Sequence, residues 1–408
     1  MKLREIYSDK EKDSKQFPKD WLSFPLGDLL TFKNGLNKES KYFGYGTPII
    51  NYMDVFNNNS LFNKDIEGKV FLNFQEKKNF SAKNGDVFFT RTSETQEEIG
   101  SAAVLLEDIE DCVFSGFVLR GRPYTNLVDK HYFQYCLTPE YVRSQIFSMS
   151  SYTTRALTNG TSLAKVNLVV PPTPNEQKAI AQVLSDTDSL IKALEKKIAK
   201  KKLIKKGVMQ KLLIQKEDWE VKTLSEVGEI ITGGTPPTTI LSYWDGKIPW
   251  VTPTDIRAEK NINSSEREIT KEGLGVIRKL PPDTLLVTCI ASIGKNAILR
   301  KAGACNQQIN AIVPNDSNDV DFLYYLIENN ASYIKGKAGI TATLMISKKD
   351  FSEITFAFPK NKIEQKQISQ ILSDIDLELE LLKQKLSKYQ LAKQGMIQQL
   401  LTGKIRLV

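Results

Sequence analysis

The sequence predicts an α+β protein in which two globular α/β domains are separated by two long helices. Three observations support this fold class. One stretch occurs twice, at residues 176–216 and 364–404, with a constant offset of 188 residues (364 minus 176) and no gap. Each copy has a helical heptad pattern, and each follows a globular segment of strand-like runs. Nearly half of the aligned positions are identical, so we interpret the stretch as an internal repeat.

Both copies of the repeat predict a coiled-coil helix. Seam residues recur at alternating steps of four and three, which distinguishes a coiled coil from the broader stripe of a surface helix. The seam positions are Ile180, Leu184, Thr187, Ile191, Leu194, Ile198, Lys201, Lys205, Val208 and Leu212, then Ile368, Leu372, Ile375, Leu379, Leu382, Leu386, Tyr389, Lys393, Met396 and Leu400. A helix over most of one copy would span roughly 55 Å. Each stripe alone could simply cover a core, but the duplication favours two helices that pack on each other.

Two seam positions in each copy depart from the apolar pattern. They are Lys201 and Lys205 in the first copy, and Tyr389 and Lys393 in the second. A polar residue in a seam reduces the stability of the helix pair. We therefore expect the pairing to be loosest here, or open to a partner subunit.

Length and composition restrict the class of protein. A chain of 408 residues exceeds one typical core, so more than one domain is expected. The net charge of +8 is compatible with a nucleic-acid partner and with many other proteins. The four cysteines are far apart and the chain has one histidine, which argues against a zinc site and a disulfide framework. No apolar signal segment or membrane-length run occurs, so we expect a reducing cytoplasm and no membrane contact.

The first half of the chain is predicted to contain a charged N-terminal arm at 1–19, a globular domain at 20–173 and a long helix at 174–216. Turn signals separate the strand-like runs of the domain. The predicted strands are 48–50, 86–90, 102–106, 112–119 and 166–170, and a helix is predicted at 130–147, between the last two strands. A proline-rich segment ends the domain, and Asn175 is the expected N-cap of the long helix.

The second half repeats this layout, with a globular domain at 217–360 and a second long helix and tail at 361–408. Its opening Asp218-Trp219 matches Asp20-Trp21. Residues 249–251 and 283–288 match residues 48–50 and 86–91, and a helix is predicted at 319–336. The domains have diverged further than the helices. We infer that the helices share one task, whereas the domains carry out two versions of another.

Several short motifs occur in the order typical of one family. They are Pro171–Gln177 and, less closely, Pro359–Gln365; Gly85–Thr90 with Ile99–Gly100; Cys305–Asn310; Asn159–Thr161 and Gly339–Thr341, the latter before Ile346–Lys349; and the C-terminal Leu400–Ile405. With these motifs and the helix repeat, nearly the whole chain resembles the specificity subunit of type I restriction–modification systems. The N-terminal arm is the part that the resemblance does not place.

The resemblance implies two target-recognition domains held apart by two antiparallel helices with pseudo-two-fold symmetry. A repeat with a constant offset is compatible with such an axis. The resemblance also implies that each domain reads one half of a bipartite site in double-stranded DNA. The helices would set the spacer and dock two methyltransferase subunits that methylate adenine. Restriction/translocase subunits would complete the complex. No cofactor is expected in this chain; S-adenosylmethionine, ATP and Mg would belong to the partner subunits.

Catalytic motifs are not evident in the sequence. It has no Asn/Asp-Pro-Pro-aromatic segment of an adenine methyltransferase and no G-x-G-x-x-G loop. Residues 292–296 contain a Gly-Lys pair without the spacing or Ser/Thr of a phosphate-binding loop. We therefore expect a non-catalytic recognition subunit.

Candidate DNA-binding residues are polar or basic side chains in loop-like stretches of both domains, because such groups contact phosphates and base edges. We nominate Arg91, Thr92, Ser93, Arg120, Arg122, Tyr152, Thr154, Arg155, Thr235, Thr238, Lys295, Asn306, Gln307, Lys337, Thr341 and Lys348. Each could instead be a solvated surface residue. Arg91 and Gln307 are the preferred candidates, although Gln307 could be a buried structural amide. The aromatic residues Trp21, Trp219 and Trp250 are expected in the core.

A lysine cluster within residues 196–206 has two interpretations. It is either a solvated helix face or a basic strip that contacts spacer phosphates, and the second helix has fewer lysines there. Two other functions stay open at this level. The chain could be a scaffold that assembles proteins, or the recognition subunit of a related restriction system with a fused methyltransferase–nuclease partner.

Overall fold

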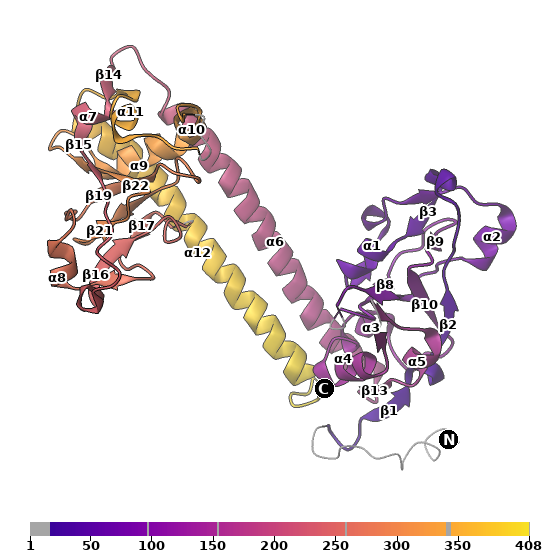
Figure 1. The fold of residues 1–408 in the computed structure, drawn as a ribbon. Helices are drawn as coiled ribbons and strands as arrows, with labels where there is room; N and C mark the ends of the chain where they lie inside the picture. Colours follow the sequence, from indigo (N-terminus) through magenta and orange to yellow (C-terminus); the bar gives the residue numbers. More distant parts are fainter. Residues whose placement is uncertain (1–16, 96–97, 153–154, 258, 340–343, 408) are drawn as a thin grey trace. The chain divides into compact units, whose positions relative to one another are not determined.

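The computed structural model describes residues 17–95, 98–152, 155–257, 259–339 and 344–407. The chain divides into two compact units, residues 1–195 with 385–408 and residues 196–384 (Figure 1). Each unit contains one globular domain and about half of each long helix. Most of the predicted N-terminal arm, residues 1–16, lies outside the described residues.

The first domain is built around a five-stranded sheet of order β2-β10-β6-β8-β4, flanked by smaller sheets β5-β3-β9, β11-β12-β7 and β1-β13. Its elements are β1 Leu22–Pro25, β2 Leu30–Asn34, β3 Phe43–Ile50, α1 Tyr52–Phe56, β4 Ser60–Leu61, β5 Lys69–Val70, α2 Phe74–Asn79, β6 Val87–Thr90, β7 Thr92–Ser93, β8 Ala102–Leu105, β9 Val113–Phe114, β10 Val118–Pro123, α3 Lys130–Cys136, α4 Glu140–Ser148, β11 Ser151–Tyr152, β12 Ala156–Leu157, α5 Gly160–Ala164 and β13 Asn167–Val170.

The central strand β6 separates two cores. Successive side chains of a strand point to opposite faces. Val87 and Phe89 therefore join the core under α3 and α4, whereas Phe88 joins the core under α1. Residues on both faces are fully buried, which explains the continuous apolar run.

The second domain repeats this architecture around a five-stranded sheet of order β15-β22-β19-β20-β17. Its elements are β14 Glu220–Thr223, α7 Leu224–Val227, β15 Gly228–Thr232, β16 Trp244–Val251, β17 Asn261–Ile262, β18 Glu268–Ile269, α8 Lys271–Gly275, β19 Thr284–Thr288, β20 Asn296–Leu299, β21 Ala304–Cys305, β22 Ile309–Pro314, α9 Val320–Asn329, α10 Ala331–Gly336, α11 Lys348–Ser352 and β23 Thr355–Phe358. The three tryptophans expected in the core, Trp21, Trp219 and Trp250, are all buried.

Three predicted elements are interrupted in the structure. The helix expected at 130–147 is two helices, because Pro139, the N-cap of α4, has an extended backbone and disfavours helical backbone in the preceding residue. The helix expected at 319–336 is divided at Asn330. The strand expected at 112–119 is β9 and β10, separated by a turn in which the Val118 N–H donates to the Ser115 carbonyl at 3.0 Å.

The two long helices have the same length. α6 spans Pro174–Leu212 and α12 spans Lys362–Leu400, 39 residues each. The expected N-cap Asn175 is wrong: α6 begins at Pro174, and the Thr173 hydroxyl accepts from the Glu176 N–H at 3.3 Å. Proline is favoured at a first helical position, since its missing N–H would have no helical partner there.

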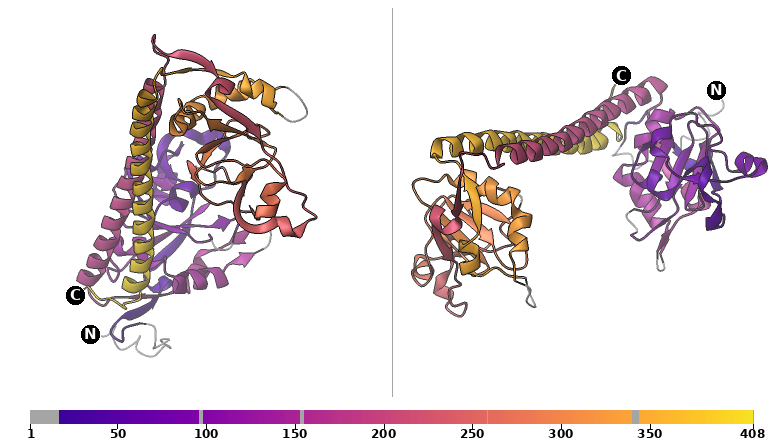
Figure 2. Two further views of the ribbon diagram at one scale, coloured as in Figure 1. Left: turned by 90° about the vertical axis from the view of Figure 1, so that its left-hand side faces the viewer. Right: turned by 90° about the horizontal axis from the view of Figure 1, so that it is seen from above.

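The helices run antiparallel, as each unit shows separately. In the first unit, Thr187 Oγ1 of α6 lies 3.6 Å from Met396 Sδ near the end of α12. In the second unit, Lys201 in the C-terminal half of α6 pairs with Glu378 in the N-terminal half of α12. The two helices lie side by side in both views of Figure 2.

The structure shows ion pairs between the helices at the seam lysines, in place of the loose pairing expected there; the alternative, openness to a partner subunit, stays a prediction. Lys393 Nζ lies 2.5 Å from Asp188 of α6, and Lys205 Nζ lies 2.9 Å from Asp376 of α12. Each aspartate also accepts a hydrogen bond from a domain tyrosine, at 3.0 Å and 2.7 Å. We name these clusters the seam triads: Tyr135–Asp188–Lys393 and Tyr325–Asp376–Lys205. Both aspartates and both lysines are related by the repeat offset, so the triads express the internal pseudo-symmetry.

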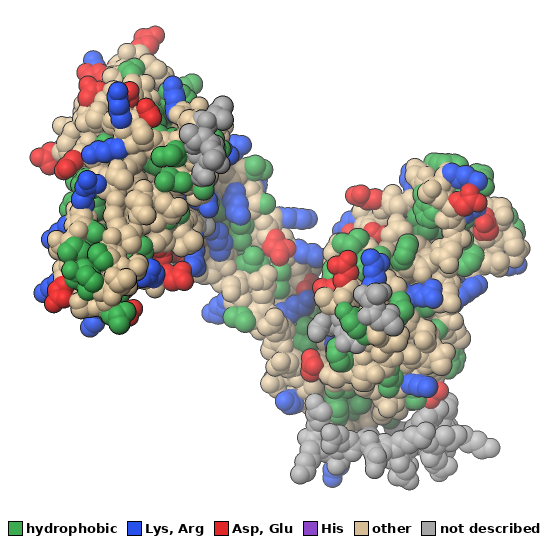
Figure 3. All heavy atoms as spheres, in the orientation of Figure 1, with side chains coloured by type: hydrophobic (Ala, Val, Ile, Leu, Met, Phe, Trp, Pro, Cys, Tyr) green, Lys and Arg blue, Asp and Glu red, His purple; other side chains and the backbone are tan. Residues whose placement is uncertain are grey.

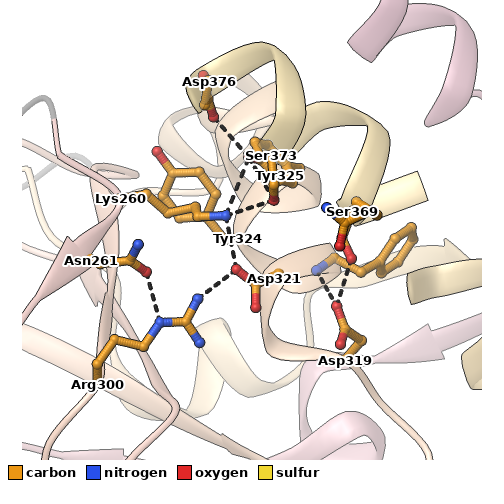
Figure 4. Close-up of polar contacts among 12 residues, drawn as sticks. Lys260, Asn261, Arg300, Asp319, Asp321, Tyr324, Tyr325, Ser369, Ser373 and Asp376 are labelled. Carbon is orange, nitrogen blue, oxygen red and sulfur yellow. Dashed lines mark hydrogen bonds and ion pairs between the residues drawn. The ribbon is translucent and has the colours of Figure 1, made fainter. Parts of the chain in front are cut away.

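Burial and the neighbouring Asp188 raise the pKa of Tyr135, and its hydroxyl therefore stays protonated as a donor. In the second unit, further polar contacts surround the triad (Figure 4). Lys260 Nζ lies 2.8 Å from both Ser373 Oγ of α12 and Asp321 of α9, and Arg300 also pairs with Asp321. Burial alone would raise the pKa of Asp321, but the bonds from Lys260 and Arg300 lower it overall.

The glutamine of the Glu-Gln pair at the start of each repeat attaches the domain to its helix. Gln177 Oε1 accepts from the Asp129 N–H at 2.8 Å, and its Nε2 donates to the Leu127 and Pro171 carbonyls at 3.0 Å. Gln365 makes the matching bond to the Asp319 N–H at 2.9 Å. Both glutamines are buried.

Candidate nucleic-acid interface

The candidate interface of each domain lies where the chain leaves the central strand, and we name this the reading edge. A buried threonine ends each strand: the Thr90 N–H donates to Ser101 O, and the Thr288 N–H donates to Lys295 O, both at 2.9 Å. Gly100 and Gly294 close the intervening loops with positive φ of 64° and 86°. The shared bonds show that the two reading edges are equivalent places in the fold.

A short hairpin packs on the reading edge of the first domain. In the first domain, β11 and β12 pair antiparallel, and β12 pairs with β7. In the second domain, Met345 forms isolated bridges to Gly339 and Ile290, so these described residues lie beside the second reading edge. A two-stranded ribbon fits the major groove of DNA.

The structure brings five of the nominated residues of the first domain to this edge. Thr92, Ser93 and Arg155 line one open pocket of about 440 Å³, together with Met53, Phe117, Glu94 and Glu98. Ser93 itself is buried and its hydroxyl donates to Glu98 at 3.2 Å, so its nomination as a DNA contact is not supported. Arg91 follows β6 directly, and its carbonyl accepts from the Thr158 N–H at 3.0 Å. Tyr152 is 55% exposed on the hairpin, whereas the nominated Thr154 lies outside the described residues.

The nominated arginines of β10 lie away from this edge and have internal partners. Arg120 is 7% exposed, and its Nη1 donates to the Ser81 carbonyl at 2.7 Å. Burial lowers the pKa of its guanidinium. Arg122 forms a bidentate pair with Asp86 at 2.7 and 2.6 Å, and Asp86 precedes the strand that the reading edge follows. Both side chains therefore fix the sheet.

Two nominated residues of the second domain meet directly. The Thr235 hydroxyl donates to Gln307 Oε1 at 2.6 Å. The alternative of a buried Gln307 is wrong, since this side chain is exposed. The buried amide is its neighbour Asn306, whose Nδ2 donates to Gln308 Oε1 at 3.0 Å.

The other nominated residues of the second domain are spread around its edge. Thr238, Lys295, Lys337 and Lys348 are exposed. Lys295 follows Gly294 at the reading edge, and Lys348 is the first residue of α11. Thr341 lies outside the described residues. DNA contact by any of the nominated side chains stays a prediction.

Sequence reasoning missed two exposed apolar residues at the first reading edge. Met53 is 54% exposed and Phe117 is 63% exposed, beside Thr92 and Arg155. Apolar side chains contact the thymine methyl group in the major groove. The only available signal was an apolar residue in a turn segment without a periodic partner, which is common on protein surfaces.

Charged side chains are mixed over the visible surface rather than gathered into one basic patch (Figure 3). Within the lysine cluster, Lys201 and Lys205 form ion pairs with α12. The exposed members are Lys196, Lys197, Lys200, Lys202 and Lys206. Successive helical residues turn by about 100°, so these five point in several directions. That distribution favours a solvated helix over a single strip.

Among the described residues, no group of three or more His, Cys, Asp or Glu side chains is arranged to hold a metal ion. In the same part of the chain, no helix is long and apolar enough to cross a bilayer. All four cysteines are free thiols buried in the domains.

Comparison with known proteins agrees with this architecture. The type I specificity subunit MjaIX of Methanocaldococcus jannaschii is 34% identical over 166 residues, which cover 39% of this chain and 38% of that protein. The chain thus matches well under half of that relative. The crystal structure of a type I S subunit from M. genitalium superposes with a TM-score of 0.61 at 15% identity, covering 97% and 98% of the two chains.

A second solved structure, described as the basis of complex assembly and conformational transition of the type I R-M system, gives a TM-score of 0.62 at 14% identity. It covers 95% of this chain and 99% of the other. At these identities, the likeness establishes the fold. The family described as type I restriction modification DNA specificity domain matches residues 18–203 and 216–389. The chain belongs to this family of DNA specificity domains.

Proposed function

We propose that the chain is the DNA sequence-specificity subunit of a type I restriction–modification complex, and that each domain reads one half of a bipartite target. The observation that carries this proposal is the duplication of the reading edge. The same backbone bonds hold Thr90 and Thr288, yet the surrounding side chains differ. Two equivalent edges with different side chains suit two different half-sites.

The seam triads support fixed attachment of each domain to the helix pair. A tyrosine of the domain, an aspartate of its own helix and a lysine of the opposite helix meet in each triad. Rigid attachment of both domains would give the target a spacer of constant length. The helices therefore act as the ruler of the bipartite site.

The helices also offer two equivalent docking positions for a partner. Leu203 of α6 is 72% exposed and Leu391 of α12 is 65% exposed, and the two are related by the repeat offset. Contiguous exposed apolar surface marks protein-interaction sites, and Leu203 lies beside Ile204, which is 42% exposed. Each position would bind one methyltransferase subunit, so that two subunits join one specificity subunit.

The chemistry of the complex would then belong to other chains. This chain recognises the target, the methyltransferase subunits bind S-adenosylmethionine and methylate adenine, and the restriction/translocase subunits use ATP and Mg. The buried free thiols are compatible with the reducing cytoplasm expected from the sequence.

Mapping of methylated adenines tests this function. The chain is co-expressed with the methyltransferase encoded beside it, and the methylated positions of the host genome are sequenced. A split motif with a fixed spacer is expected. A continuous short motif would contradict the proposal. An assembled complex without DNA binding would instead favour a protein scaffold, and a neighbouring gene for a fused methyltransferase–nuclease would point to a related restriction system.

A further inference from the structure

One place in the fold presents an amide side chain at the reading edge of both domains. It lies where the turn after β9 or β21 passes the loop after β2 or β15. The Leu36 N–H donates to Phe114 O at 2.9 Å, and the Gly234 N–H donates to Cys305 O at 2.8 Å. These matching bonds make Asn37 equivalent to Thr235.

The turn residues are equivalent by the same criterion. The Ser115 N–H donates to Ile50 O and the Asn306 N–H donates to Val251 O, both at 2.9 Å. Gly116 is therefore equivalent to Gln307. The next residue of each turn accepts a backbone hydrogen bond from the residue that follows the central strand. The Arg91 N–H donates to Phe117 O at 3.1 Å, and the Cys289 N–H donates to Gln308 O at 2.8 Å. This place thus belongs to the reading edge.

In the second domain, the turn supplies the amide and the loop supports it. The exposed Gln307 accepts from the Thr235 hydroxyl at 2.6 Å, across 72 residues of sequence. Within the described part of the chain, the Gln307 Nε2 donates no hydrogen bond. The oxygen has a second lone pair. The amide is therefore held in one orientation while a donor and an acceptor stay available.

In the first domain, the loop supplies the amide and the turn makes room for it. Gly116 has no side chain, and a Cβ at this residue would overlap Asn37 Oδ1. Asn37 is exposed. The two domains thus place an amide at the same point of the fold from opposite sides, with a small or supporting residue across from it.

We propose that this place is an adenine-reading site in both domains, occupied by Gln307 for the second half-site and by Asn37 for the first. The proposal rests on the proposed function and adds the base that is read. Adenine presents the N7 acceptor beside the N6 donor in the major groove, which matches the donor and acceptor of an amide. Guanine presents two acceptors, and an amide oxygen opposes one of them.

Support from Thr235 gives Gln307 an advantage that a free surface glutamine lacks. A glutamine has several rotatable bonds, and binding must restrict them. A hydrogen bond already present in the free protein restricts them before DNA arrives, so less binding free energy is lost. Thr235 is a positioning residue in this arrangement, whereas Gln307 contacts the base.

The test compares methylation by complexes that carry wild type, Gln307→Ala or Gln307→Glu, with the first half-site as internal control. Gln307→Ala is expected to reduce discrimination at one adenine of the second half-site by about 5- to 150-fold. Gln307→Glu is expected to move the preference there to cytosine, whose N4 donates to a carboxylate. Asn37→Ala is expected to reduce discrimination at one adenine of the first half-site, with the second half-site as the internal control.

The proposal would be overturned if base discrimination by the Gln307→Ala complex were unchanged at every position, or were lost at a base other than adenine or in the first half-site. The bipartite function would still stand in each of these cases. Absence of any DNA target for the wild-type complex would overturn both. Thr235→Val is expected to weaken discrimination at the Gln307 position without changing the preferred base, and Thr235→Ser to restore it. The exposed neighbour Thr239 provides the matched control, since Thr239→Val is expected to change neither. Unchanged discrimination in Thr235→Val would remove the positioning role.

Discussion

The seam triads predict unequal costs for two equivalent substitutions, Asp188→Asn and Asp376→Asn. Each removes the carboxylate that faces a seam lysine. The side chains of Lys393 and Asp188 are 20% and 25% exposed, so their ion pair is intermediate between an exposed pair and a buried one. Exposed pairs contribute about 0–1 kcal/mol, and removal of one partner from a buried pair costs about 3–5 kcal/mol. We therefore expect Asp188→Asn to cost about 2 kcal/mol.

Among the described residues, the lysine of the second triad has a second carboxylate partner, whereas Lys393 of the first triad has one. Lys205 also lies 3.3 Å from Glu328 of α9, so its charge keeps a carboxylate in Asp376→Asn. We expect this variant to cost about 1 kcal/mol, near the exposed limit. The asparagine oxygen still accepts from the tyrosine in both variants, which leaves the ion pair as the main difference.

Calorimetry of the purified chain measures the contrast. A loss of 1 kcal/mol lowers the midpoint by roughly 2–4 °C in a unit of 150–250 residues. Asp188→Asn is therefore expected to lower the transition of the first unit by about 4–8 °C, and Asp376→Asn that of the second by about half as much. Glu328→Gln combined with Asp376→Asn should equalise the two. An equal or larger shift for Asp376→Asn alone would refute this account of the triads.

Three further predictions follow from the described contacts. Leu203→Glu and Leu391→Glu are each expected to reduce methyltransferase binding from two subunits to one, and the double variant is expected to bind none. Native mass spectrometry counts the bound subunits, with Lys200→Glu as the charge control. Retention of two subunits in both single variants would contradict the docking positions. Because folding lowers the pKa of Asp321, its contribution to stability is complete above about pH 4 and is lost as the pH falls through the folded pKa. Asp321→Asn should flatten the acid limb of the stability curve, and an unchanged limb would count against the Lys260–Asp321 contact. Burial raises the pKa of Cys289 to about 11 and of Cys112 and Cys305 to about 12. Iodoacetamide at pH 8.5 should therefore alkylate these thiols only after unfolding, as mass spectrometry would show.

The helices could be predicted from the sequence because their signal is local and repeated. Heptad spacing over nearly 40 residues, present twice, overrides single departures such as Lys205. The break at Pro139 also had a local signal in the proline itself. By contrast, the triads could not be foreseen, because Asp188 and Asp376 follow the seam positions 187 and 375 and reach the lysines only in the antiparallel register.

The candidate site was predicted by residue type. Residue type alone cannot distinguish a side chain that is held by an internal partner from one that is available to bind DNA. Arg122 and Arg155 looked alike in the sequence, yet Arg122 is held by Asp86 and Arg155 lines the open pocket. Thr235 and Gln307 were nominated separately, and only the fold joins them. The role suggested here for Asn37 depends on the glycine opposite it, which a single residue in a sequence cannot reveal.

The glutamine attachment explains how the domains could diverge while the helices stayed alike. Within the described residues, Gln177 bonds to main-chain atoms of the domain, the Asp129 N–H and the Leu127 and Pro171 carbonyls. Gln365 likewise bonds to the Asp319 N–H and the Ser317 and Pro359 carbonyls, with one further bond to the side chain of Asn318. Main-chain groups are the same whatever side chains a domain carries. A substitution at a reading edge therefore leaves this joint intact, and the protein can acquire a new target half-site without rebuilding the support on which the domain is mounted.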